Sequence, residues 1–120
     1  MYYKNKSNLP SYKFSDFKKA CKNPKEVIIF SDAYYFADLY FSLRTKKQIL
    51  SFIQSDGLEN LSFLNTRRWG KNPNKNNPIM VDSYEFISGY RKGYLAFMYN
   101  KITGKWIIKS FHTSKHMEHQ

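Results

Sequence analysis

Hydrophobic positions in the first half of the chain recur mainly at helical spacing. Ser15 can cap a short helix that stops before Pro24, and residues 31–41 and 46–57 also place apolar side chains three or four positions apart. Between the first two of these segments, the β-branched run at residues 25–30 is typical of a strand. We therefore expect three helices and one short strand, preceded by an extended arm at residues 1–12.

The helical segments have faces that we expect to be buried. Thr45 is the expected N-cap of the third helix and Gly57 its end. The expected buried residues are Ala33, Phe36, Ala37 and Tyr40 in the second helix, and Ile49, Leu50 and Ile53 in the third. Aromatic side chains at this spacing indicate core rather than a platform for stacking bases. Cys21 shares the apolar face of the first helix, which indicates a small buried hydrophobe rather than a nucleophile.

After Gly57 the pattern changes to the alternation of strands. Residues 61–69 place Leu61, Phe63, Asn65 and Arg67 on one face. Residues 79–89, 92–101 and 104–111 are three further strands with short, glycine-containing links, as in hairpins. Strict alternation in the last one puts Ser110 with Trp106 and Ile108. Residues 70–78 form a loop that is too polar to bury and basic enough to contact phosphate.

Helices and strands are segregated along the chain rather than alternating. This order predicts an α+β fold in which N-terminal helices pack on a three- to four-stranded antiparallel sheet. The length of 120 residues fits a single domain spanning 1–120, with residues 113–120 as a flexible tail. Because 42% of the residues are hydrophobic and 18% are aromatic, a packed core is expected.

The formal charge of +11 narrows the class of partner. Residues 60–120 hold ten basic and three acidic side chains, so the excess is denser in the strand-rich half. A phosphate-rich partner is the leading inference, and solubility or a coding bias toward Lys and Asn is the alternative. One cysteine excludes an internal disulfide, and no apolar run approaches the ~20 residues of a membrane span, so we expect a cytoplasmic protein with no membrane partner.

Several catalytic classes have little support. His112 and His116 are four residues apart with Glu118 nearby, but they lack a zinc-protease frame, so no metal site is expected. Asp82 and Glu85 alternate onto opposite faces of their strand, which argues against a pair of catalytic carboxylates.

The chemistry that remains depends on Tyr, His, Lys and Arg. These side chains suit RNA cleavage through the ribose 2′-OH, because cations neutralise the phosphorane while His, Tyr or Lys moves protons. The candidates in the basic half are Arg67, Arg68, Lys71, Tyr84, Tyr94, Lys109 and His112. Each also has an ordinary interpretation, as a sheet aromatic or a solvated cation.

The order of several segments resembles a known family. The segments are YKFSDFKK, KEVIIF, DAYYFADLYFSL, ILSFIQSDGLENLSFLNT, VDSY, GYLAF and IIKSFH. In this order they are similar to motifs of the MqsR family of toxin–antitoxin ribonucleases, within the RelE-like superfamily of small basic mRNA-cleaving toxins. The resemblance covers roughly residues 12–112.

The resemblance implies a RelE-like fold and a metal-independent mRNA interferase that needs no cofactor. Its partners would be mRNA, free or on the ribosome, and a cognate protein antitoxin. The tyrosine of the family's YLK strand matches Tyr94, and His112 replaces the basic residue after SF. The family's other site residues fall on Asn65, Val81 and Ala96, so Arg67 or Arg68 would have to supply the missing charge.

Two other functions remain open. The chain could be a non-catalytic nucleic-acid-binding module, in which Lys71 and Lys75 of the loop at residues 67–75 contact the backbone and Trp69 stacks on a base. It could also be a small inhibitor that binds an acidic protein. Within the toxin hypothesis, Tyr94 and His112 would move protons, with Arg67, Arg68 and Lys109 on the phosphate and Tyr84 among the RNA-binding residues.

Overall fold

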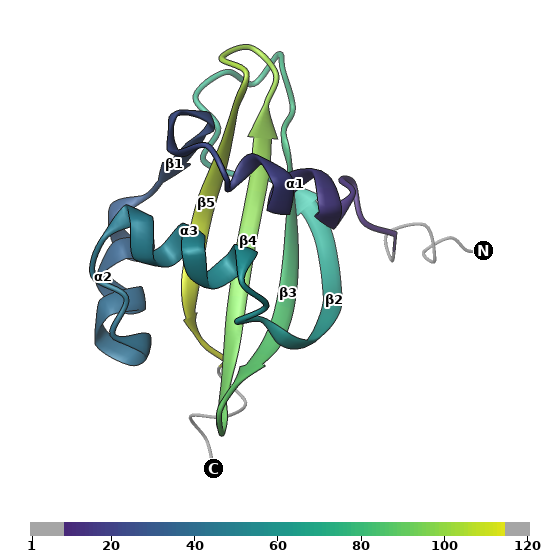
Figure 1. Cartoon of the computed structure of the whole chain (residues 1–120). Helices are drawn as coiled ribbons and strands as arrows, with labels where there is room; N and C mark the ends of the chain where they lie inside the picture. The colour runs from purple at the N-terminus through teal and green to yellow at the C-terminus, as the bar shows by residue number, and fades with distance from the viewer. Residues whose placement is uncertain (1–8, 115–120) are drawn as a thin grey trace, which may run out of the picture.

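The computed structural model describes residues 9–114. It contains three α-helices, one short 3-10 helix and five strands (Figure 1). Their bounds are α1 Phe14–Ala20, η2 Pro24–Glu26, β1 Val27–Ile29, α2 Ser31–Phe41, α3 Lys46–Gln54, β2 Glu59–Arg68, β3 Met80–Ser88, β4 Arg91–Asn100 and β5 Lys105–Thr113. The α+β class is confirmed, and the three α-helices all precede β2, although β1 lies between α1 and α2.

The five strands form one mixed sheet in the order β1-β5-β4-β3-β2. The meander from β2 to β5 is antiparallel as expected, but β1 joins the far edge parallel to β5. The expectation of a three- to four-stranded antiparallel sheet was therefore wrong. The reason is that residues 27–29 pair with residues 106–108, a partnership between distant segments that no local pattern reveals.

The start of α3 agrees with the sequence prediction, whereas the start of α1 and the end of α3 do not. Thr45 caps α3 as expected, because its side chain accepts from the Gln48 backbone N–H while the Gln48 side chain accepts from the Thr45 N–H, which completes a capping box. The first helix differs: it begins at Phe14 with Lys13 in the N-cap position, so Ser15 lies inside the helix. The third helix ends at Gln54, three residues before Gly57.

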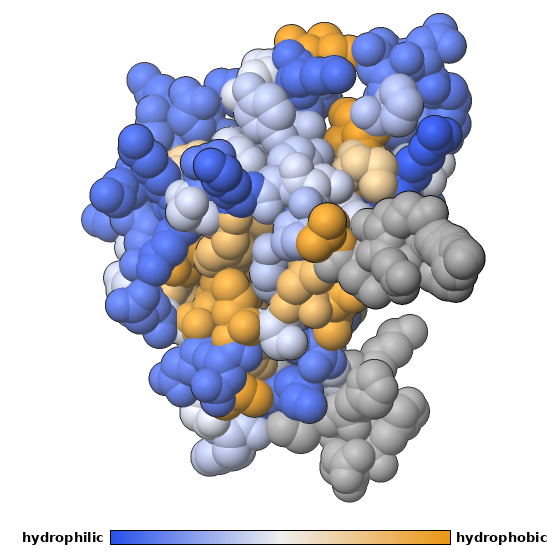
Figure 2. All heavy atoms as spheres, turned by 90° about the vertical axis from the view of Figure 1, so that its right-hand side faces the viewer, coloured by the Kyte–Doolittle hydropathy of each residue, from blue (hydrophilic) through white to orange (hydrophobic). Residues whose placement is uncertain are grey.

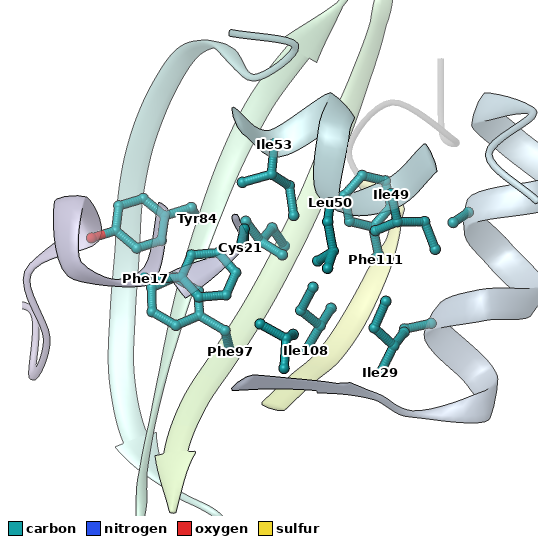
Figure 3. Packing of buried hydrophobic residues seen from close by; sticks show 14 of the residues in the cluster. Phe17, Cys21, Ile29, Ile49, Leu50, Ile53, Tyr84, Phe97, Ile108 and Phe111 are labelled. Atoms are coloured by element: carbon teal, nitrogen blue, oxygen red, sulfur yellow. The ribbon is translucent and has the colours of Figure 1, made fainter. Parts of the chain in front are cut away.

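The main core lies between the helices and one face of the sheet (Figure 3). The Phe17 ring of α1 stacks on the Phe97 ring of β4 with centroids 3.9 Å apart. Ile49, Leu50 and Ile53 are buried, which confirms the predicted face of α3. Cys21 is buried in the same cluster, as expected of a small hydrophobe.

The side of the sheet that faces away from the helices is called the second face. A smaller core covers the end of this face where β3 and β5 begin and β4 ends. Val81, Met98 and Ile107 are buried there and pack with Ile79 and Trp69 from the connection between β2 and β3. The same connection includes Asn72, which is only 5% exposed and bonds with the Asn74 N–H and the Asn77 carbonyl. The expectation that this loop is too polar to bury was wrong at Asn72, because both polar ends of its side chain find backbone partners.

Two register shifts decide which residues reach the second face. In β2, Phe63 pairs with Tyr84 but Asn65 pairs with Ser83, so Leu64 is an extra residue. In β5, Ser110 pairs with Ala96 but Ile108 pairs with Phe97, so Lys109 is an extra residue. Such bulges interrupt alternation. The sequence analysis placed Phe63 on the same face as Asn65, and Ile108 on the same face as Ser110. Both predictions were wrong, because each bulge puts the two residues on opposite faces.

The segments that flank the fold are tied down at both described ends. The Asp82 carboxylate, fully buried, accepts hydrogen bonds of 3.0 Å from the backbone N–H groups of Ser11 and Tyr12. At the other end, Thr113 closes β5 and Ser114 is buried. The rest of the expected arm and tail, residues 1–8 and 115–120 with His116 and Glu118, lies outside the described residues.

Candidate nucleic-acid interface

A row of three polar side chains crosses the second face toward the end where β3 and β5 finish and β4 begins. Glu85 of β3 pairs with Tyr94 of β4, and Tyr94 pairs with His112 of β5. Side chains of directly paired residues point to the same face, so the bulge at Lys109 is what places His112 in this row. The Tyr94 and His112 rings stack with centroids 4.8 Å apart and an interplanar angle of 17°.

Hydrogen bonds orient each member of the row. His112 Nδ1 lies 2.6 Å from the Thr113 carbonyl oxygen, which can only accept, so Nδ1 carries a proton and Nε2 is left to exchange one. The Tyr94 hydroxyl donates to Ser83 Oγ at 2.8 Å. The Ser114 hydroxyl donates to Glu85 Oε2 at 2.8 Å, and Lys92 Nζ lies 4.0 Å from Glu85 Oε1.

The row lines a hollow of about 370 Å³, which we call the central hollow. Its walls are Leu64, Arg67, Glu85, Tyr94, Ser110, His112 and Ser114. Arg67 reaches this face because Asn65 and Arg67 follow the bulge at Leu64 and pair with Ser83 and Val81. The hollow therefore combines a carboxylate, an imidazole, a phenol and a guanidinium, which are groups able to move protons and to neutralise phosphate.

A second hollow of about 510 Å³, which we call the α2 hollow, adjoins the first. It lies where the start of α2, the end of β5 and the segment after β2 meet. Phe36, Trp69, Lys71, Lys109 and His112 are among its lining residues. A smaller space of about 230 Å³, with Arg67, Trp69, Tyr94 and Lys109 in its walls, lies on the same face. Basic and aromatic side chains are thus interleaved there.

Most of the sequence-predicted site residues lie on this face. Arg67, Trp69, Lys71, Tyr94, Lys109 and His112 all line one or more of the three hollows. Arg68 borders the smallest hollow, but it pairs with Met80, so alternation turns its side chain toward the other face. Lys75 lines none of them, and its ammonium donates to the Gly70 carbonyl at 2.6 Å.

Tyr84 does not belong to the interface, and its assignment to RNA binding was wrong. It is 6% exposed and lies in the main core, where its ring stacks on Phe97 at 5.9 Å and meets Phe14 edge-on at 5.2 Å. Burial, together with the nearby Asp82 carboxylate, raises the pKa of the Tyr84 hydroxyl. The cause is strand alternation, which turns Tyr84 toward the helices and its neighbours Ser83 and Glu85 away from them.

Two residues of the interface were missed from the sequence. Glu85 was considered only as a partner of Asp82, and those two carboxylates do lie on opposite faces, but Glu85 faces Tyr94 instead. Phe36 was assigned to the core with Ala33 and Ala37; the alanines are buried, whereas Phe36 is partly exposed and meets His112 edge-on at 6.0 Å.

Among residues 9–114, no group of three or more His, Cys, Asp or Glu side chains is arranged to hold a metal ion. Within the same residues, none of the helices has the length and apolar character required to cross a membrane.

No protein-family model, curated protein or solved structure matches this chain.

Proposed function

We propose that this chain is an endoribonuclease that cleaves single-stranded mRNA. The observation that carries the proposal is the central hollow, in which Arg67, Glu85, Tyr94 and His112 line one open space on a strongly basic protein. The resemblance to MqsR-family toxins, with their RelE-like fold, favours the same activity.

The reaction that suits these groups is transfer within the RNA itself. The ribose 2′-oxygen attacks the adjacent phosphorus, the bond to the 5′-oxygen of the next nucleotide breaks, and a 2′,3′-cyclic phosphate and a 5′-hydroxyl result. Glu85 takes the proton from the 2′-hydroxyl. Protonated His112 gives a proton from Nε2 to the leaving oxygen. The charge gained by the phosphorane is neutralised by Arg67.

The remaining groups position the substrate. Tyr94 donates its hydroxyl hydrogen to Ser83 and stacks on His112, so it holds the imidazole in place beside the substrate. Lys109 stands at the junction of the α2 hollow and the smallest hollow, where it holds the RNA backbone. Because binding depends on several cations, its affinity should fall steeply as salt rises.

In the cell we propose a growth-inhibiting cytoplasmic toxin whose second face is covered by a protein antitoxin when it is inactive. An acidic antitoxin would complement the +11 charge. Its substrate would be mRNA, free or on the ribosome.

The test is cleavage of labelled single-stranded RNA by the purified protein in EDTA. Wild type and Lys47→Ala, a change of an exposed lysine on α3, should cut equally and leave cyclic phosphate ends. His112→Ala, Glu85→Gln and Arg67→Ala should each cut roughly 10²- to 10⁴-fold more slowly. Expression of His112→Ala should also allow growth that wild type stops.

Three outcomes would contradict the proposal. RNA binding without cleavage would identify a non-catalytic binding module. Loss of wild-type cleavage in EDTA would exclude the metal-independent reaction. A His112→Ala variant as active as Lys47→Ala would remove His112 from the mechanism.

A further inference from the structure

The α2 hollow is larger than the central hollow and has a different chemical character. Its volume of about 510 Å³ lies within the usual range for small-molecule sites, about 300–1,000 Å³. Its two sides are built from distant parts of the chain, with Phe36 on α2 facing the segment that carries Trp69 and Lys71. The proposed cleavage reaction uses only His112 and Lys109 of this lining, so the aromatic residues and Asp32 have no role in it.

The two hollows share part of their walls. Ser110 and His112 line both of them. A ligand with its phosphate beside His112 therefore has room to extend into the α2 hollow. A nucleotide has this shape, because its base projects from the sugar next to the phosphate.

Aromatic side chains in the α2 hollow are held in place by other rings. Phe36 stacks on Tyr40 with centroids 5.9 Å apart and an interplanar angle of 13°. Trp69 packs against Phe30, 6.1 Å away. Rings that are fixed before binding lose little freedom when a flat ligand stacks on them, so they favour a nucleobase.

Polar groups of both signs also line the α2 hollow. Asp32 contributes a carboxylate from α2, and Lys71 and Lys109 contribute ammonium groups from two other segments. Within residues 9–114, none of these three groups is engaged in an ion pair. A negatively charged acceptor and positively charged donors are therefore available to the same ligand.

Guanine is the base that matches this combination. Its Watson–Crick edge presents two adjacent donors, N1–H and N2–H₂, to a carboxylate, and its O6 and N7 are adjacent acceptors for a lysine. Adenine, cytosine and uracil each present no more than one donor beside an acceptor on the Watson–Crick edge. We propose that the α2 hollow is a guanine-binding subsite, with Asp32 as the residue that selects guanine. The link of this subsite to cleavage rests on the proposed function.

Calorimetric titration with the four nucleoside 3′-monophosphates tests the subsite without any cleavage. We expect 3′-GMP to bind about tenfold more tightly than 3′-AMP, 3′-CMP or 3′-UMP. Asp32→Asn should abolish that preference. The matched control is Asp38→Asn, a change of the other carboxylate of α2, which pairs with Arg44 outside the hollow and should leave the preference intact.

The aromatic wall has its own variant. Phe36→Leu keeps an apolar side chain on α2 and should weaken all four nucleotides by a similar factor, about fivefold or more. Circular dichroism spectra that match wild type would show that each variant is folded.

Equal binding of the four nucleotides, or an identical response of Asp32→Asn and Asp38→Asn, would overturn the subsite. These results are separate from those for the proposed function. A protein that prefers 3′-GMP but cuts no RNA keeps the subsite and loses the nuclease, and a protein that cuts all sequences equally keeps the nuclease and loses the subsite.

Discussion

Replacing Gly93 with alanine should destabilise the fold strongly, although it adds only one methyl group. Gly93 lies opposite Phe86 in the β3–β4 ladder, on the side of the sheet that carries the helices. A Cβ atom at this position would lie 2.2 Å from Phe86 Cζ and 2.5 Å from its Cε1. Ordinary carbon contacts are about 3.5–4.0 Å, so the ring or the strand would have to move by about 1 Å or more.

The Phe86 ring has little room to move. It is 1% exposed and lies among Phe41, Phe52 and Phe111, with centroids 5.6, 6.2 and 5.5 Å away. Overpacking of a dense core costs about 1–3 kcal/mol, and this contact belongs at the upper end, about 3 kcal/mol. That is a large part of the roughly 5–15 kcal/mol by which a domain is stable.

Urea unfolding followed by tryptophan fluorescence measures the loss. The matched control is Gly70→Ala, because a Cβ there meets no heavy atom within 4 Å, and its free energy of unfolding should stay within about 0.5 kcal/mol of wild type. Adding Phe86→Leu to Gly93→Ala should recover part of the loss, as expected for two residues in contact. If Gly93→Ala were no less stable than Gly70→Ala, the packing argument would be refuted.

Three further properties can be checked directly. Asp82→Asn should lower the free energy of unfolding by about 1–3 kcal/mol, since one of the two backbone N–H groups held by the buried carboxylate loses its acceptor; an unchanged urea midpoint would contradict this. Burial raises the pKa of Cys21 to about 12, so a thiol reagent at pH 8 should label it only as fast as the protein unfolds, and immediate labelling of the native protein would disprove the assignment. Burial and the Asp82 carboxylate raise the pKa of the Tyr84 hydroxyl above its ordinary value of 10.0. Above about pH 10 the unfolded chain therefore binds fewer protons than the folded chain, and stability should fall as the pH rises. The urea midpoint of Tyr84→Phe should fall less than that of wild type between pH 9 and 11.

Features of the fold that depend only on residues close together in the sequence could be predicted from the sequence. Thr45 and Gln48 mark the start of α3 because a capping box needs only neighbouring residues. The three hairpin-linked strands follow from alternation and from the glycines between them. The pairing of β1 with β5 depends instead on two segments about eighty residues apart, and nothing within residues 25–30 specifies that partner.

The candidate site was predictable in its chemistry but not in its geometry. Arg67, Tyr94 and His112 were identified by residue type within the basic half, and the fold brings them to one hollow. Glu85 and Phe36 could have been found only by knowing which strand and which helix lie beside His112. Tyr84 was selected by residue type but lies in the main core, because neighbouring residues of a strand face opposite sides of the sheet.

The two extra residues, Leu64 and Lys109, also bear on how such a protein can change over evolution. A strand with one residue more than its partner can lose that residue and still keep the same neighbours in the sheet. A descendant without Lys109 would therefore keep the fold and would keep His112 paired with Tyr94, because Ile108 and Ser110 already face opposite sides of the sheet. A single in-frame deletion could thus remove one cation from the α2 hollow and the smallest hollow while leaving the lining of the central hollow in place.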